Sequence, residues 1–176
     1  MQRVPRTLAV AAGGGGDGAD VVRLAVGLVR RRPGWSGVVV AGPYAGAWDR
    51  LTDDVATRLR VASDVRGCAR LFASAEAVVQ MAGYNSTFEA LRTGSRPILA
   101  PRRWPRREQA IRASRLASWG LADVVDAGAS VDEVDWLLDQ PRTVTGQSLA
   151  QAGITFDGAA RTAEHLGALA AARSAA

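Results

Sequence analysis

Residues 78–115 constrain the fold more than any other stretch, because they contain two successive units in which a strand leads into a helix. The first unit begins with the mostly apolar run 78–83, which is typical of a buried strand that opens onto a turn. A helix is predicted directly after it, with Phe88 and Leu91 at helical spacing and Gly94 at its end. Repeated alternation of this kind predicts an α/β fold with a parallel sheet covered by helices on both faces.

The start of this helix is a candidate anion site. The first turn of a helix has free N–H groups and a partial positive charge, so hydroxyls beside those amides suit a phosphate or a diphosphate. The candidate diphosphate ligands are Gly83, Asn85, Ser86 and Thr87.

Glu89 lies one turn into the same helix, where a carboxylate is unsuited to a phosphate. A carboxylate only accepts hydrogen bonds, and it is able to hold two neighbouring hydroxyls such as those of a ribose. The alternative is that Glu89 only complements the helix dipole. The residues alone leave both interpretations open.

The second unit repeats this plan. Residues 96–101 are predicted to form a strand that ends in proline, and a basic loop leads into a helix over 107–119. Glu108 and Gln109 stand at the start of this helix, on the same edge of the sheet, where a carboxylate and an amide suit the hydroxyls of a sugar. An acidic first turn without a ligand is the alternative.

The segments AGYNSTFE (82–89) and EQAIRA (108–113), with the proline-ended strand between them, resemble the pattern GGYNTxxE and EQxxRA. That pattern belongs to the C-terminal, nucleotide-sugar-binding half of glycosyltransferases with the two-domain GT-B fold. The chain resembles glycosyltransferase family 28, which includes the N-acetylglucosaminyltransferase of peptidoglycan synthesis, and more closely a group of bacterial predicted glycosyltransferases. The resemblance covers residues 8–138. Ala82 stands where a first glycine is common.

The resemblance implies a Rossmann-like three-layer α/β/α sandwich with a parallel sheet of about six strands. It implies a nucleoside-diphosphate sugar as the donor, most simply a uridine-linked one, with Glu89 on the ribose and the α-helix start on the diphosphate. Glu108 and Gln109 would bind the sugar, and backbone groups of Val65 and Arg66 would bind the base. No cofactor or metal is expected, because a helix terminus and arginine side chains suffice to stabilise the departing diphosphate.

A glycine-rich loop, GGGGDG at 13–18, is a second candidate phosphate site. It follows a predicted strand, and glycine lets the backbone approach an oxyanion closely. The loop is neither a G-x-G-x-x-G fingerprint nor a P-loop, and a flexible strand-to-helix turn is the alternative. Its position matches the glycine loop of the resembled family, so Gly14, Gly15 and Gly16 are assigned to the diphosphate.

The general base is not found in this chain, because in the resembled enzymes the base and the acceptor site lie in the N-terminal domain. The chain is therefore expected to need an acceptor-binding N-terminal domain or subunit and to be inactive alone. Three other functions compete with this one. They are one half of a nucleotide-sugar epimerase, a scaffold or binding module without chemistry, and nucleic-acid binding.

Three parts are predicted along the chain. Residues 1–140 form the nucleotide-sugar-binding domain, 141–156 form a linker because they are rich in Thr, Gln, Ser and Gly, and 157–176 form a C-terminal helix and tail. The other predicted strands cover 7–12, 38–42, 59–62 and 122–126, and the other predicted helices cover 19–31, 48–55, 64–72 and 131–138.

The composition is that of a globular domain: 176 residues, 48% of them hydrophobic. No apolar run is long enough to span a membrane and no signal peptide is visible, so a cytoplasmic protein is expected. Cys68, the single cysteine, cannot form an internal disulfide or a metal cluster, and a buried structural role is favoured over a nucleophile.

All 22 basic residues are arginine, and the net charge is +5. The arginines are scattered apart from two clusters, at 30–32 and around Trp104, and this distribution favours other anionic partners over nucleic acid. The expected anionic partners are the donor diphosphate and, through peripheral contact, the inner face of a membrane that carries a lipid acceptor.

Overall fold

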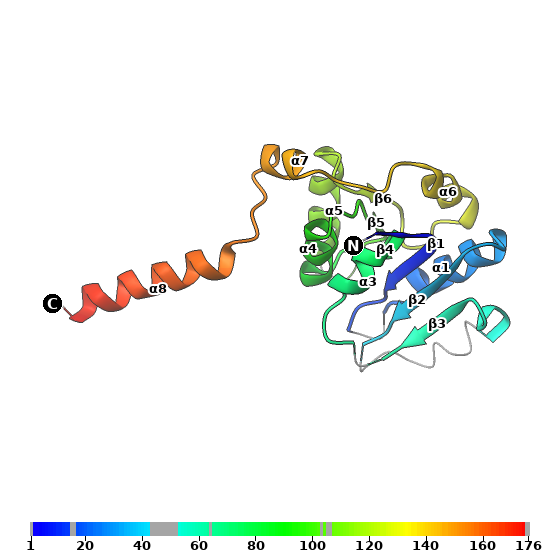
Figure 1. Ribbon diagram of the computed structural model, residues 1–176, viewed down its shortest axis with the longest axis horizontal. Coiled ribbons are helices and arrows are strands. Elements are labelled where there is room, and N and C mark those ends of the chain that lie inside the picture. Colours follow the sequence, from blue (N-terminus) through cyan, green and yellow to red (C-terminus); the bar gives the residue numbers. More distant parts are fainter. Residues whose placement is uncertain are drawn as a thin grey trace.

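The computed structural model describes residues 2–14, 17–42, 53–63, 65–102, 104 and 107–174. Its core is one parallel sheet of six strands in the order β3-β2-β1-β4-β5-β6 (Figure 1). The strands are β1 (Val4–Ala11), β2 (Ser36–Val40), β3 (Leu59–Ala62), β4 (Ala75–Gln80), β5 (Ile98–Leu99) and β6 (Asp123–Val124). The predicted α/β sandwich with a parallel sheet is confirmed.

The strand order reverses at β1. The chain first builds outward from β1 through β2 to β3, and then returns to place β4 against the other side of β1. Ligands of doubly wound sheets bind at the carboxyl ends of the strands beside such a reversal. The topology therefore predicts a ligand site between the loops that follow β1 and β4.

Helices cover both faces of the sheet, as the three hydrophobic clusters show. One face is covered by α1 (Ala19–Arg31) and α6 (Val131–Asp135), which continues into a 3-10 turn (Trp136–Asp139). The other face is covered by α3 (Ala69–Ser74), α4 (Tyr84–Arg92) and α5 (Glu108–Ser118). A further 3-10 turn spans Asp53–Val55, and the other predicted residues of helix 48–55 lie outside the described residues.

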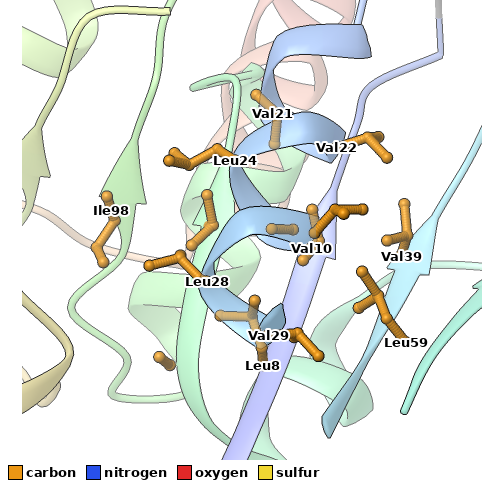
Figure 2. Close-up of a cluster of buried hydrophobic side chains, with 14 of the residues drawn as sticks. Leu8, Val10, Val21, Val22, Leu24, Leu28, Val29, Val39, Leu59 and Ile98 are labelled. Atoms are coloured by element: carbon orange, nitrogen blue, oxygen red, sulfur yellow. The ribbon is translucent and has the colours of Figure 1, made fainter. Parts of the chain in front are cut away.

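The alternation of side chains along β1 explains the two-sided burial. Leu8 and Val10 belong to the cluster under α1, whereas Ala9 and Ala11 belong to the cluster under α3 and α4. In Figure 2, Leu24 and Leu28 of α1 lie on the side of Ile98, whereas Val22 lies toward Val39 of β2. Each buried leucine of this kind contributes about 2–5 kcal/mol to stability when compared with alanine.

The helix predicted over 64–72 begins later than expected. The chain from Val65 to Cys68 forms a loop, and α3 begins at Ala69. The reason is local: Gly67 has a φ of +75°, in the left-handed region, which no α-helix accommodates. The result is a loop between β3 and α3 that stands at the carboxyl edge of the sheet.

Residues 141–156, expected to be a linker, pack against the body of the domain. They contain α7 (Gly146–Gln151), whose Leu149 is buried against the cluster under α4 and α5. Arg142 is buried and pairs with Asp123, with 2.6 Å between Nη1 and Oδ2, and Thr143 forms a β-bridge with Ser95.

The C-terminal helix α8 (Gly158–Ser174) differs from all the others. Figure 1 shows it extending away from the sheet, and its residues 158–173 are exposed. None of the helices that the structure describes, α8 included, is long and apolar enough to cross a membrane.

Candidate functional site

A cavity of about 750 Å³ opens at the carboxyl ends of the strands. It lies where the strand order reverses, between the loops that follow β1, β2, β3 and β4. Its lining residues come from all four of those segments: Ala11, Gly13, Gly14, Val40, Ala41, Gly42, Val65, Arg66, Cys68, Gly83, Tyr84, Asn85 and Ser86.

This cavity brings together three groups of residues that the sequence singled out separately. Gly14 comes from the glycine loop, Val65 and Arg66 from the loop after β3, and Gly83, Asn85 and Ser86 from the start of α4. They are far apart in the sequence, yet they line one hollow. Gly15 and Gly16, which were assigned to the same role, lie outside the described residues.

The first turn of α4 supplies donors to this cavity. Gly83 is the N-cap, and the first amide with an acceptor inside the helix is that of Thr87, which donates to the Gly83 carbonyl at 3.0 Å. The amides of the preceding residues belong to the first turn, where intrahelical acceptors are missing. They carry the positive end of the helix dipole, which makes this end of the cavity suited to an anion.

Ala82 sets the sharp turn from β4 into α4. Its φ is +62°, in the left-handed region that non-glycine residues rarely adopt, and its side chain is buried. The carbonyl oxygen of Ala82 accepts a hydrogen bond from Nη1 of Arg112 at 2.6 Å. The geometry explains why a glycine is common at this position in the pattern that the chain resembles.

Thr87, a predicted diphosphate ligand, does not line the cavity. It is fully buried, and its hydroxyl finds no hydrogen-bond partner within the described part of the chain. Its hydroxyl is therefore not offered to a ligand in the cavity. Gln80, which sequence reasoning missed, is also fully buried at the end of β4, and its Nε2 lies 3.4 Å from the Ser86 carbonyl oxygen. A polar residue closing an apolar strand was the available signal.

Glu89 lies on the second turn of α4 and faces the loop after β3. Its Oε2 accepts a hydrogen bond from the backbone N–H of Cys68 at 2.6 Å. A Cβ atom at Gly67 would lie 3.4 Å from Oε1 of the same carboxylate. Glu89 therefore connects α4 by a hydrogen bond to the loop that carries Val65 and Arg66. The sequence pattern does not predict this role.

Cys68 is among the residues that line the cavity, but its thiol is not an activated nucleophile. Burial, and next the charge of Glu89, raise the pKa of Cys68 to about 11. The thiol is therefore protonated at neutral pH, and the thiolate is the reactive form.

Glu108 and Gln109, the predicted sugar ligands, stand at the start of α5 and outside the lining of this cavity. Both contact Arg102: Oε1 of Gln109 accepts its backbone N–H at 3.2 Å, and Oε1 of Glu108 lies 3.6 Å from its Nη2. Arg102 also forms an ion pair with Asp17, which lies near the end of the glycine loop 13–18. Within the described residues, no cluster of three or more His, Cys, Asp or Glu side chains suits a metal ion.

No protein-family model matches the sequence, and no curated protein matches it by sequence similarity. Solved structures of glycosyltransferases do match its fold. A glycotransferase of kitacinnamycin superimposes with a TM-score of 0.65 at 17% identity, over 85% of this chain and 38% of its own.

Two further structures match in the same way. The spinosyn rhamnosyltransferase SpnG, complexed with thymidine diphosphate, gives a TM-score of 0.62 at 21% identity and covers 85% of this chain. MurG of Acinetobacter baumannii gives 0.59 at 15% identity and covers 77% of this chain. The match takes in only 40% and 41% of those two structures. The chain thus has the fold of the C-terminal half of GT-B glycosyltransferases and spans well under half of their length.

Proposed function

We propose that the chain is the donor-binding half of a glycosyltransferase. It would bind a nucleoside-diphosphate sugar, and the hexosyl or N-acetylhexosaminyl group would pass from it to an acceptor hydroxyl. The observation that carries this proposal is the cavity at the strand reversal, where the glycine loop, the loop after β3 and the first turn of α4 meet. The fold shared with solved glycosyltransferases supports it.

The start of α4 is proposed to hold the diphosphate. Transfer breaks the bond between the anomeric carbon and the β-phosphate oxygen, and negative charge develops on that oxygen. The first-turn amides and the helix dipole stabilise this charge without moving, which is how preorganised donors lower a barrier. Arg66, which lines the same cavity, adds a full positive charge.

The nucleoside is proposed to lie against the loop after β3. Backbone groups at Val65 and Arg66 would bind the base, and Glu89 would bind the ribose. A carboxylate has about four lone-pair sites, so Glu89 is able to accept the Cys68 amide and a ribose hydroxyl at the same time. A uridine-linked donor is proposed, and the thymidine diphosphate in the SpnG structure supports a pyrimidine base.

The acceptor site and the general base are assigned to an N-terminal domain or partner subunit, so the chain alone would not turn over. The matched solved structures are more than twice as long as the portion that this chain covers, which supports a separate acceptor-binding domain or subunit. The proposed setting is the cytoplasm, with peripheral contact to an anionic membrane surface. No metal or other cofactor is proposed.

Calorimetric titration tests the proposal. The chain is titrated with UDP, UDP-N-acetylglucosamine, thymidine diphosphate and a GDP-sugar, with NAD as the control nucleotide, and sugar release is followed in parallel. Saturable binding of a pyrimidine nucleotide is expected, and it should weaken in Arg66→Ala. The matched control is Arg115→Ala, which removes the same charge from an exposed position outside the cavity. Failure to bind any nucleotide would reject the proposal.

A further inference from the structure

Arg102 joins two loops that the chain places far apart in sequence. It follows β5 closely, and its Nη1 pairs with Oδ2 of Asp17 at the end of the glycine loop. Its Nη2 lies 3.6 Å from Oε1 of Glu108 at the start of α5. One guanidinium thus lies between a carboxylate of the glycine loop and a carboxylate of the predicted sugar site.

The backbone of Arg102 contacts the second predicted sugar ligand. Its N–H donates to Oε1 of Gln109 at 3.2 Å, which restrains the orientation of that amide and leaves its NH₂ donors out of this contact. The separation of 3.6 Å from Glu108 is an ionic contact but too long for a hydrogen bond. Among the described residues, Arg102 therefore balances part of the Glu108 charge without occupying the lone pairs of its carboxylate.

We propose that Arg102 is a positioning residue that holds Glu108 and Gln109 ready for the donor sugar and couples them to the glycine loop. Polar groups held in place before binding lose less rotamer entropy when the ligand arrives, so they contribute more affinity. Within the described part of the chain, the ion pairs and hydrogen bonds of Arg102 reach Asp17 and the sugar-binding pair, but not Gly14, the α4 start or the loop after β3. Arg102 should therefore govern how much tighter a nucleotide sugar binds than the bare nucleotide. This inference rests on the proposed function.

The coupling itself is measured without any ligand. In two-dimensional NMR spectra of the chain, Asp17→Asn should shift the signals of Glu108 and the side-chain amide of Gln109, because Arg102 transmits the change. Arg102→Ala should shift both those signals and those of Asp17 and Gly18. The matched control Arg115→Ala removes an arginine from α5, the helix that begins with Glu108 and Gln109, and should move neither group. Unmoved Glu108 and Gln109 signals in Asp17→Asn would overturn the inference, even if Arg102→Ala failed to fold.

The effect on specificity is measured by titration. Arg102→Ala should lower affinity for UDP-N-acetylglucosamine about tenfold while affinity for UDP changes less than about twofold. Arg102→Lys should restore part of the difference, because lysine keeps the charge but lacks the fork that reaches two carboxylates. An equal loss for both ligands would mean a purely structural role and would overturn the inference. Absence of nucleotide binding by the unmodified chain rejects the proposed function instead, and the NMR result still decides whether Arg102 couples the loops.

Discussion

Oε2 of Glu89 accepts a hydrogen bond from the backbone N–H of Cys68 at 2.6 Å, which joins the second turn of α4 to the loop after β3. If Glu89 also binds the ribose, Glu89→Ala should weaken nucleotide binding by about 2–4 kcal/mol, since a charged acceptor is lost. Glu89→Gln separates the two roles, because its amide oxygen is still able to accept the Cys68 N–H. We expect this variant to keep the thermal stability of the parent chain and to lose affinity. A folded Glu89→Ala with unchanged affinity in calorimetry would remove Glu89 from the nucleotide site.

The raised pKa of Cys68 predicts how the thiol reacts. With a pKa of about 11, few thiols are ionised at pH 8, so alkylation by iodoacetamide should be slow and should accelerate tenfold for each pH unit up to that value. Glu89→Gln removes the neighbouring negative charge and should lower the pKa, which would speed the reaction at pH 8. An equal rate in both proteins would show that Glu89 does not act on the thiol.

The same shift has a consequence for stability. The folded chain keeps the Cys68 proton to higher pH than the unfolded chain, whose thiol has the ordinary value of 9.0. Above that pH the unfolded state binds fewer protons than the folded state, so the free energy of unfolding should fall as pH rises from about 9 to 11. Cys68→Ser should lack this part of the pH dependence in urea titrations, and a persisting slope would assign it to other groups.

The left-handed backbone at Ala82 makes an unusual prediction for a glycine substitution. Ala82→Gly relieves a backbone cost of about 1–2 kcal/mol, but it also removes a buried methyl group worth about 0.8 kcal/mol. The remaining gain is about 1 kcal/mol or less, so the urea midpoint should rise slightly. Ala82→Val is the contrasting variant and should be strongly destabilising, because a β-branched residue tolerates positive φ poorly. A marked loss of stability in Ala82→Gly would contradict this balance.

The half-buried carboxylate of Asp123 should matter more than an exposed one, because it faces a buried arginine. It pairs with Arg142 at 2.6 Å and with Arg96 at 2.8 Å, and the Arg142 side chain is only 3% exposed. Asp123→Asn leaves these cations without their counter-charge, and about 3–5 kcal/mol of stability should be lost. Asp132→Asn breaks the exposed pair with Arg31 and should change stability little. Similar urea midpoints for the two variants would show that the buried pair is not needed.

Local patterns predicted much of the fold because they depend on neighbours in the sequence. The helix expected over 19–31 coincides with α1, and the one expected over 107–119 differs from α5 by one residue at each end. In the stretch 141–156, the polar composition predicts a linker, whereas the structure contains α7 there. The available signal was Thr145 followed by Ser148, which together cap α7 as a capping box.

The contacts within the candidate site were not predictable in the same way. Glu89 and Cys68 are 21 positions apart, and Asp17 and Arg102 are 85 apart. Which side chain meets which depends on how neighbouring loops are placed by the sheet, and no local pattern records that. Residue chemistry suggested that Glu89 accepts hydrogen bonds, but it did not say from which donor.

The reversal of strand order has a mechanical consequence. The sheet consists of two successive segments of three strands each, β1 to β3 and β4 to β6. The two segments join where β1 pairs with β4. Gly14 belongs to the first segment and Ser86 to the second, and the cavity spans the seam between them. A molecule that fills the cavity contacts both segments at once. Its binding should therefore stabilise the folded arrangement of the two segments against unfolding.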